Sequence, residues 1–184
     1  MFVLRRLAIS AAAFLCAATL SPQLNVAAAA ENSSAQLLLR SPSLSQSAIA
    51  FRYADDIWTV ARTGGAAERL TSEGNVLSGP YYSPDGGMIA YSARVHGNEQ
   101  IFTIPAAGGI PKQITWHPAG STALGWTPDG KEIFFSSMME SPRHYLRIYK
   151  AHADGSGLPE MLPLPMAFEG NYSPDGQSFA YEPV

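Results

Sequence analysis

The sequence has only one cysteine and no clear helical pattern. Cys16 lies in an apolar N-terminal stretch, so the rest of the chain carries neither a disulfide nor thiolate chemistry. No segment after residue 30 repeats its apolar residues every 3.6 positions, so we expect almost no helix there. These absences exclude a disulfide-stapled scaffold and a helical bundle.

Basic residues are also few. The chain has 12 Lys and Arg against 15 Asp and Glu, a net charge of −3. Without Arg5 and Arg6 the net charge is −5, and no basic patch remains. Because nucleic-acid binding needs a concentrated basic surface, we exclude nucleic acid as a partner.

Residues 1–30 predict a secretory signal peptide. A short positive start at Arg5 and Arg6 precedes an apolar run over 7–20, and Ala28 to Ala30 offers an A-x-A cleavage site. That run is shorter than the roughly 20 residues of a membrane span, so we expect no span in the mature chain. Residues 31–38 form a short lead. We expect an exported protein, periplasmic or secreted, and the missing disulfides favour a bacterial periplasm.

The sequence repeats itself. "YYSPDGGMIAY" at 81–91 returns as "GWTPDGKEIFF" at 125–135 and as "NYSPDGQSFAY" at 171–181, spaced by 44 and then 46 residues. We place a degenerate earlier copy at Ser41-Pro42. The repeat predicts units at about 39–79, 80–125 and 126–171, with a truncated unit at 172–184.

The repeated motif predicts a corner between two strands. Pro presets φ for a type I turn, Asp tolerates the next position, and Gly permits a left-handed exit. We therefore expect positive φ at Gly86, Gly130 and Gly176. An aromatic residue before each corner is positioned to pack against the next sheet: Tyr82, Trp126, Tyr172. The structural turn residues are Ser83, Pro84, Asp85, Gly86, Thr127, Pro128, Asp129, Gly130, Ser173, Pro174, Asp175 and Gly176.

The strands are apolar at successive positions, which indicates sheets that are covered on both faces. Together with four short strands per unit, this predicts an all-β fold, a partial β-propeller of about three and a half four-stranded blades. A two-sheet sandwich is the alternative. We expect one sheet from strands at 48–54, 56–62, 67–72 and 76–82, and the next from 88–94, 100–105, 111–116 and 121–126. The third unit has "PEMLPLP" where Leu-Thr is expected, which weakens the placement of its third strand.

Motifs that carry chemistry are missing. The chain has no G-x-S-x-G, H-E-x-x-H, P-loop or G-x-G-x-x-G pattern, so we predict no catalytic residue, metal or cofactor. The Asp55-Asp56 pair is interpreted as a turn entering a strand. The histidines are interpreted as solvated loop residues: His96, His117, His144, His152. The loop from Met138 to His144 is the place where we expect a partner contact.

A family resemblance rests on the first unit. "LLLRSPSLSQSAIAFRYADDIW" and the following "RLTS" resemble the start of tricorn-type serine proteases, including exported bacterial homologues, and the resemblance covers residues 37–184. It implies WD40-like (PD40 or TolB-like) repeats in a six-bladed N-terminal propeller that guides or filters peptides. A second propeller, a PDZ-like domain and the peptidase core would follow. Since the catalytic residues lie in those later domains, none is carried over, and the chain is interpreted as truncated.

Two other functions stay open. The S-P-D-G-x-x-I-A-Y element also occurs in TolB, a protein-interaction module of the periplasm, and in some exported hydrolases such as amidohydrolases. A TolB-like protein would begin with an α/β domain, and only about ten residues separate Ala30 from the first unit. In each case we expect a peptide or protein partner.

Overall fold

The computed structural model describes residues 38–141, 143 and 145–183. The predicted signal peptide (1–30) and nearly all of the lead (31–38) lie outside these residues. The described residues form strands, turns and loops without a helix, so none of their segments is a helix that a bilayer would accommodate as a span. The all-β prediction is confirmed.

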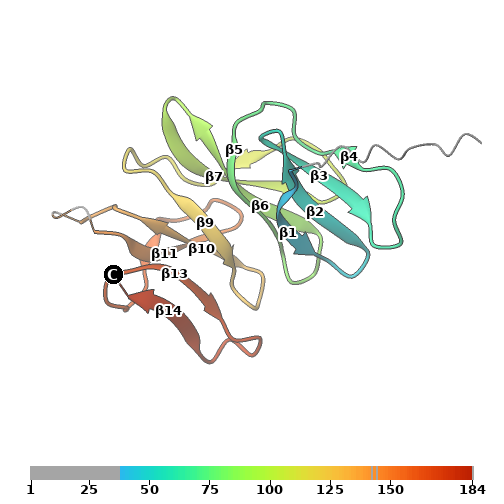
Figure 1. Ribbon diagram of the computed structural model, residues 1–184. Helices are drawn as coiled ribbons and strands as arrows, with labels where there is room; N and C mark the ends of the chain where they lie inside the picture. The colour runs from blue at the N-terminus through green and yellow to red at the C-terminus, as the bar shows by residue number, and fades with distance from the viewer. Residues whose placement is uncertain (1–37, 142, 144, 184) are drawn as a thin grey trace, which may run out of the picture. The chain divides into compact units, whose positions relative to one another are not determined.

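The strands form four antiparallel sheets, which follow one another along the chain (Figure 1). Sheet 1 consists of β1 (Arg40–Leu44), β2 (Ala48–Tyr53), β3 (Asp56–Ala61) and β4 (Glu68–Arg69). Sheet 2 consists of β5 (Val76–Tyr82), β6 (Met88–Val95), β7 (Asn98–Pro105) and β8 (Lys112–Gln113). Sheet 3 consists of β9 (Thr122–Trp126), β10 (Glu132–Ser137), β11 (Arg147–His152) and β12 (Glu160–Met161). Sheet 4 pairs β13 (Ala167–Tyr172) with β14 (Phe179–Pro183). This repeated four-stranded arrangement is that of propeller blades, and four separate sheets do not fit a two-sheet sandwich.

The predicted strand positions agree with the structure, but their grouping was wrong. The strand at 76–82 pairs with β6 across the corner, so it opens sheet 2 instead of closing sheet 1. The strand at 122–126 likewise opens sheet 3. The reason is that a tight corner forces its two flanking strands to pair as a hairpin. Sheets 2 to 4 therefore begin a few residues before the corresponding sequence units.

The position of the first corner also needs correction. Ser41 and Pro42 lie inside β1, and the turn follows at Ser45. Ser45 Oγ accepts a hydrogen bond from the Ala48 amide (3.0 Å), as Ser83 Oγ does from Met88 (2.9 Å). Ser45 is thus the equivalent of Ser83. The first turn is two residues shorter and lacks Pro-Asp-Gly, which is why the sequence alignment missed it.

The third unit keeps its outer strand despite "PEMLPLP". Strand β12 pairs with β11, and the Leu162 amide donates to the Ile148 carbonyl at 2.9 Å. The same bond joins Leu70 to Ile57 at 2.8 Å in sheet 1. Backbone pairing fixes this short strand, because it needs no particular side chain.

The core lies between consecutive sheets, and neighbouring residues of one strand face different clusters. In β6, Ile89 and Tyr91 pack with Ala50 and Ile57 of sheet 1, whereas Ala90 packs toward sheet 3. In β10, Phe135 packs toward sheet 2 and Phe134 toward sheet 4. Side chains alternate across a strand, so a middle strand must be apolar at both kinds of position. This explains the continuous apolar runs.

The corners stack on one another along the chain. Each Pro-Asp-Gly corner closes with a 2.8 Å bond, such as that from the Gly86 amide to the Ser83 carbonyl. Positive φ is confirmed for Gly86 (74°), Gly130 (70°) and Gly176 (71°). A Cβ added at Gly130 would lie 3.4 Å from Pro84. One added at Gly176 would lie 3.4 Å from Pro128. The positive φ therefore favours Gly at all three positions, and at Gly130 and Gly176 the proline of the preceding corner leaves little space for a side chain.

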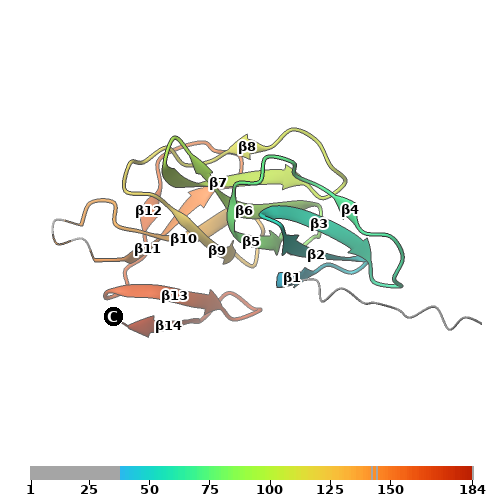
Figure 2. The same cartoon turned by 45° about the horizontal axis from the view of Figure 1, so that its top comes forward.

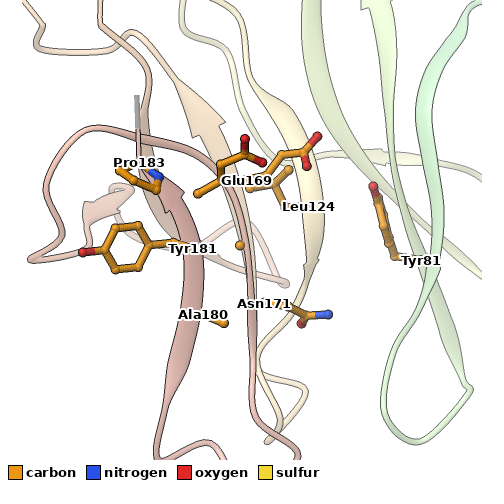
Figure 3. Close-up of a pocket in the computed structure, with 9 residues that line it drawn as sticks. Tyr81, Leu124, Glu169, Asn171, Ala180, Tyr181 and Pro183 are labelled. Carbon is orange, nitrogen blue, oxygen red and sulfur yellow. The ribbon is translucent and has the colours of Figure 1, made fainter.

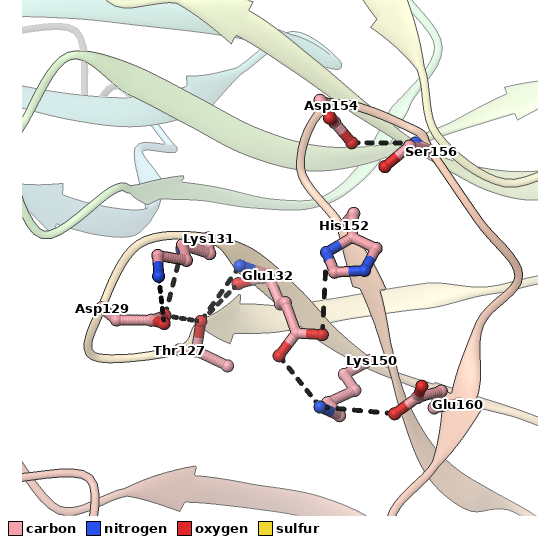
Figure 4. Close-up of polar contacts among 9 residues, drawn as sticks. All are labelled: Thr127, Asp129, Lys131, Glu132, Lys150, His152, Asp154, Ser156 and Glu160. Atoms are coloured by element: carbon pink, nitrogen blue, oxygen red, sulfur yellow. Dashed lines mark hydrogen bonds and ion pairs between the residues drawn. The ribbon is translucent and has the colours of Figure 1, made fainter.

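Each Pro-Asp-Gly corner also carries a hydrogen bond between two of its side chains. Ser83 Oγ donates to Asp85 (2.5 Å), which also accepts the Gly87 amide at 3.0 Å. Figure 4 shows the same hydrogen bond in the next corner, where Thr127 Oγ1 donates to Asp129 (2.7 Å). The hydroxyl bond, followed by the backbone bond, lowers the pKa of Asp85 and Asp129, and Asp175 is lowered in the same way. Ser and Thr therefore exchange at this position because both supply the hydroxyl.

The aromatic residues before the corners pack against the preceding sheet and not the next one. The Trp126 indole Nε1 donates to the Tyr81 carbonyl of sheet 2 at 2.9 Å. The rings of Tyr172 and Phe134 of sheet 3 lie 5.4 Å apart, edge to face. The direction differs from the expectation because the strand before each corner belongs to the new sheet.

Substituting the corner glycine tests the stacking. Gly86→Ala should lower the free energy of unfolding by about 1–2 kcal/mol, because the left-handed φ strains any Cβ and this one would also press on Ser45. The matched control is Gly87→Ala, whose Cβ would make an ordinary 3.5 Å contact with Asp85. Urea unfolding of both variants measures the difference. Equal effects at the two positions would contradict the strained corner.

Candidate functional site

An open cavity of about 630 Å³ follows the first strands of sheets 2 to 4. Strands β5, β9 and β13 lie beside one another, and each contributes lining residues. Figure 3 shows Glu169 and Asn171 of β13 between Tyr81 of β5 and Tyr181, whose ring points away from Tyr81. The lining consists of Tyr81, Leu124, Glu169, Gly170, Asn171, Ala180, Tyr181, Glu182 and Pro183.

The first strand of each sheet is an edge strand, so backbone N–H and C=O groups lie along the cavity. Strands β5, β9 and β13 each have a hydrogen-bonded neighbour on one side only. Some free edge groups are used between sheets: Ser78 Oγ donates to the Ala123 carbonyl at 3.3 Å. The edge therefore offers further backbone donors and acceptors beside the exposed side chains.

The lining supports binding and offers no nucleophile paired with a base. Its polar side chains, among the described residues, are two carboxylates, two phenols and an amide, from Glu169, Glu182, Tyr81, Tyr181 and Asn171. Such groups recognise hydrogen-bonding or charged ligands. None of them was singled out from the sequence. The available signal was the charge of Glu169, in a strand whose counterparts β5 and β9 carry no charged residue.

The structure confirms that Asp55 and Asp56 form a turn and the start of a strand. Asp55 is exposed at φ 58°, whereas Asp56 is buried. Asp56 Oδ1 accepts bonds from Thr71 Oγ1 (2.8 Å) and the Gly74 amide (3.1 Å). In sheet 2, Gln100 accepts from Thr115 Oγ1 at 2.8 Å in the same manner. Asp56 thus connects the start of β3 to the segment that follows β4.

Three of the four histidines lie among the described residues, and His144 lies outside them. His96 occupies an exposed turn at φ 49°, and His117 Nδ1 accepts the Ala119 amide at 3.1 Å. His152 Nδ1 lies 3.9 Å from Glu132 Oε1 (Figure 4). Within the described ranges, no three His, Cys, Asp or Glu residues gather as a metal site requires.

The loop between β10 and β11 has a fixed base and an exposed rim. Met139 is buried, and the Tyr149 hydroxyl donates to its carbonyl. Glu140, Arg143 and Tyr145 help to line an open cavity of about 400 Å³. Pro142 and His144 lie outside the described residues, and the partner contact at this loop stays a prediction.

Glu99 is a partly buried carboxyl between sheets 2 and 3. Burial raises its pKa. Hydrogen bonds with Thr122 and Ser92, and the charges of Arg94 and Arg52, lower the pKa and so offset part of this rise. Its Oε1 is buried without a hydrogen-bond partner among the described residues. The ionised form is therefore disfavoured in the folded chain.

Replacing Glu99 tests this cost. A raised folded-state pKa gives stability that is complete below the ordinary carboxyl pKa and is lost as the pH rises through the folded pKa. Glu99→Gln should thus raise the free energy of unfolding at pH 7.5 by about 0.5–1 kcal/mol. This value is small because solvent screens part of the charge of the partly buried carboxylate. The gain should shrink toward pH 4. Urea unfolding at both pH values measures it, with exposed Glu68→Gln as control. A pH-independent gain would contradict the charge-based explanation.

Comparison with known proteins identifies one protein family over the whole described region. A family model of the tricorn protease N-terminal beta propeller domain matches residues 36–184. The chain is 31% identical over 100 residues to tricorn protease homolog 1 of Streptomyces coelicolor, covering 54% of this chain and 9% of that protein. The chain spans about a tenth of the length of the curated tricorn homologues that it matches.

Solved structures share the fold. A putative TolB from Agrobacterium tumefaciens superposes with a TM-score of 0.68 at 24% identity, covering 79% of this chain and 53% of that one. The tricorn protease superposes with a TM-score of 0.64 at 22% identity, covering 76% of this chain and 14% of that one. Both likenesses support the propeller fold, and the family match spans every described sheet. The chain belongs to the family of tricorn protease N-terminal beta propeller domains.

Proposed function

We propose that this chain is a non-catalytic propeller module that guides or filters peptides for an exported serine peptidase of the tricorn type. The observation that carries the proposal is the family match over 36–184, joined to a cavity that follows the edge strands and presents binding groups only. Peptide-bond cleavage would belong to other domains of such a protein. The signal-peptide pattern of residues 1–30 supports export to the periplasm or beyond.

The cavity's chemistry suits an extended peptide. Edge strands offer backbone N–H and C=O groups, which an extended chain satisfies without regard to its side chains. Tyr81 adds apolar surface with a hydroxyl, and Glu169 adds charge. A site of this kind binds many peptides weakly, as a guiding surface requires.

A TolB-like interaction module and the propeller of another exported hydrolase are the remaining alternatives. The likeness to TolB lies below 25% identity and supports the fold alone. Binding of a folded protein without binding of short peptides would favour the TolB-like role.

The proposal predicts peptide binding without cleavage. The purified chain should bind extended, unstructured peptides and leave them intact over long incubation, because serine proteolysis needs a nucleophile with a base in reach and an oxyanion site. Calorimetry measures the binding and mass spectrometry the peptides. Cleavage that a serine-directed inhibitor blocks would overturn the non-catalytic assignment.

Variants of the cavity locate the binding. Tyr81→Ala and Glu169→Gln should each weaken peptide binding several-fold, since each removes a contact of about 1 kcal/mol. Trp116→Ala is the control, because Trp116 is an exposed aromatic residue that lines neither this cavity nor the cavity of the β10–β11 loop. Unchanged affinity in both cavity variants would exclude this surface as the binding site.

A further inference from the structure

Four equivalent positions in the four sheets carry a pair of polar residues directly opposite each other. Each pair joins the first strand of a sheet to its second strand. In every sheet the second-strand residue lies at the same distance along the chain from the corner hydroxyl residue, once the two-residue shorter turn of sheet 1 is taken into account. The pairs are Arg40–Arg52, Ser78–Ser92, Thr122–Ser136 and Glu169–Glu182. The middle two are neutral hydroxyl pairs, whereas sheet 1 carries two positive charges and sheet 4 two negative charges.

A cross-strand pair of like charges is unfavourable, and the neutral pairs show that this fold does not need it. Arg40 and Arg52 nevertheless stand opposite each other in β1 and β2. Neither guanidinium lies within 4.0 Å of a carboxylate of the described residues. Arg52 acts electrostatically on Glu99, but only as the smallest contribution to the pKa of that carboxyl. Local rules are broken chiefly where a site requires it, so the pair is a candidate site for an anion.

The geometry holds one guanidinium in place. Arg52 is half-buried, and its Nη1 donates to the Leu77 carbonyl on the first strand of sheet 2. Ser92 uses the same position to accept the Ala123 amide of sheet 3 at 2.7 Å. The role of joining two sheets therefore needs only a short polar side chain. The additional donors of a guanidinium exceed that structural need.

Both arginines line one cavity. It has a volume of about 280 Å³ and is completed by Leu38, Tyr53, Ala54 and Asp55. Asp55 is exposed and forms no ion pair with either arginine. Two planar guanidinium forks match the paired oxygens of a carboxylate or phosphate. The space suits such a group with a few attached atoms.

We propose that Arg40 and Arg52 form an oxyanion subsite that binds a peptide carboxylate. The assignment to a peptide rests on the proposed function, whereas the anion site itself does not. The carboxylate is supplied either by a chain terminus or by an acidic side chain. Arg52 is held toward sheet 2 by its bond to Leu77, and Arg40 completes the fork from the neighbouring strand.

Calorimetric titration of the purified chain with inorganic phosphate tests the subsite. Arg40→Gln should weaken phosphate binding about tenfold, because a charge-assisted bond contributes that much, and Arg40→Lys should restore part of it. Arg62→Gln is the matched control, an exposed arginine in the turn after β3 that does not line the cavity. Thermal unfolding of Arg40→Gln should show unchanged or higher stability, since a like-charge pair is relieved. Equal phosphate affinity in wild type and Arg40→Gln, or equal weakening in Arg62→Gln, would overturn the site.

Three acetylated tripeptides then identify the source of the carboxylate. Trialanine with a free C-terminus, its amide, and an amidated Ala-Glu-Ala are titrated into wild type and Arg40→Gln. Arg40-dependent binding of the free acid alone assigns a chain terminus, and Arg40-dependent binding of Ala-Glu-Ala amide assigns an acidic side chain. Arg40-dependent phosphate binding without any Arg40-dependent peptide binding would overturn the peptide carboxylate. Peptide binding at the 630 Å³ cavity that survives Arg40→Gln would leave the proposed guiding function standing while this subsite fails as a peptide site.

Discussion

The packing of each sheet against its neighbour is the interaction on which the rest of the structure depends. A middle strand such as β10 directs Phe135 to one neighbouring sheet and Phe134 to the other, and both side chains are fully buried. Each ring removes about 150–250 Å² from water, so a sheet that loses a neighbour loses much of its stability. The long apolar runs, the short outer strands and the interlocking aromatic residues all follow from this requirement.

The corners set the spacing at which those faces meet. Pro84 lies against Gly130, and Pro128 lies against Gly176, so each of these corners packs directly against the next one. Ser83, Thr127 and Ser173 hold their turns through a hydroxyl that bonds both an aspartate and a strand amide. A single motif thus fixes the turn, the hairpin and the distance between sheets, which gives a physical reason for its repetition about every 44 residues.

Much of the fold was readable from the sequence, because corners and apolar runs are local signals. The strand positions and the positive φ of the corner glycines required nothing more. The grouping of strands into sheets failed since it depends on pairing across the corner, and the first corner was missed because Ser45 lacks the Pro-Asp-Gly that follows Ser83. The Arg40–Arg52 and Glu169–Glu182 pairs were not predictable, because residues far apart in sequence become opposite only once strand register is known.

Native-state hydrogen exchange tests the dependence on neighbouring sheets most directly. The amides of β6 and β10 belong to sheets that are covered on both faces, whereas β2 belongs to a sheet covered on one face by the described residues. The account predicts that β6 and β10 exchange only by global unfolding, and that β2 opens locally at a lower free energy. Equal opening free energies for β2, β6 and β10, or faster exchange in β10 than in β2, would contradict the claim that neighbouring sheets supply the stability.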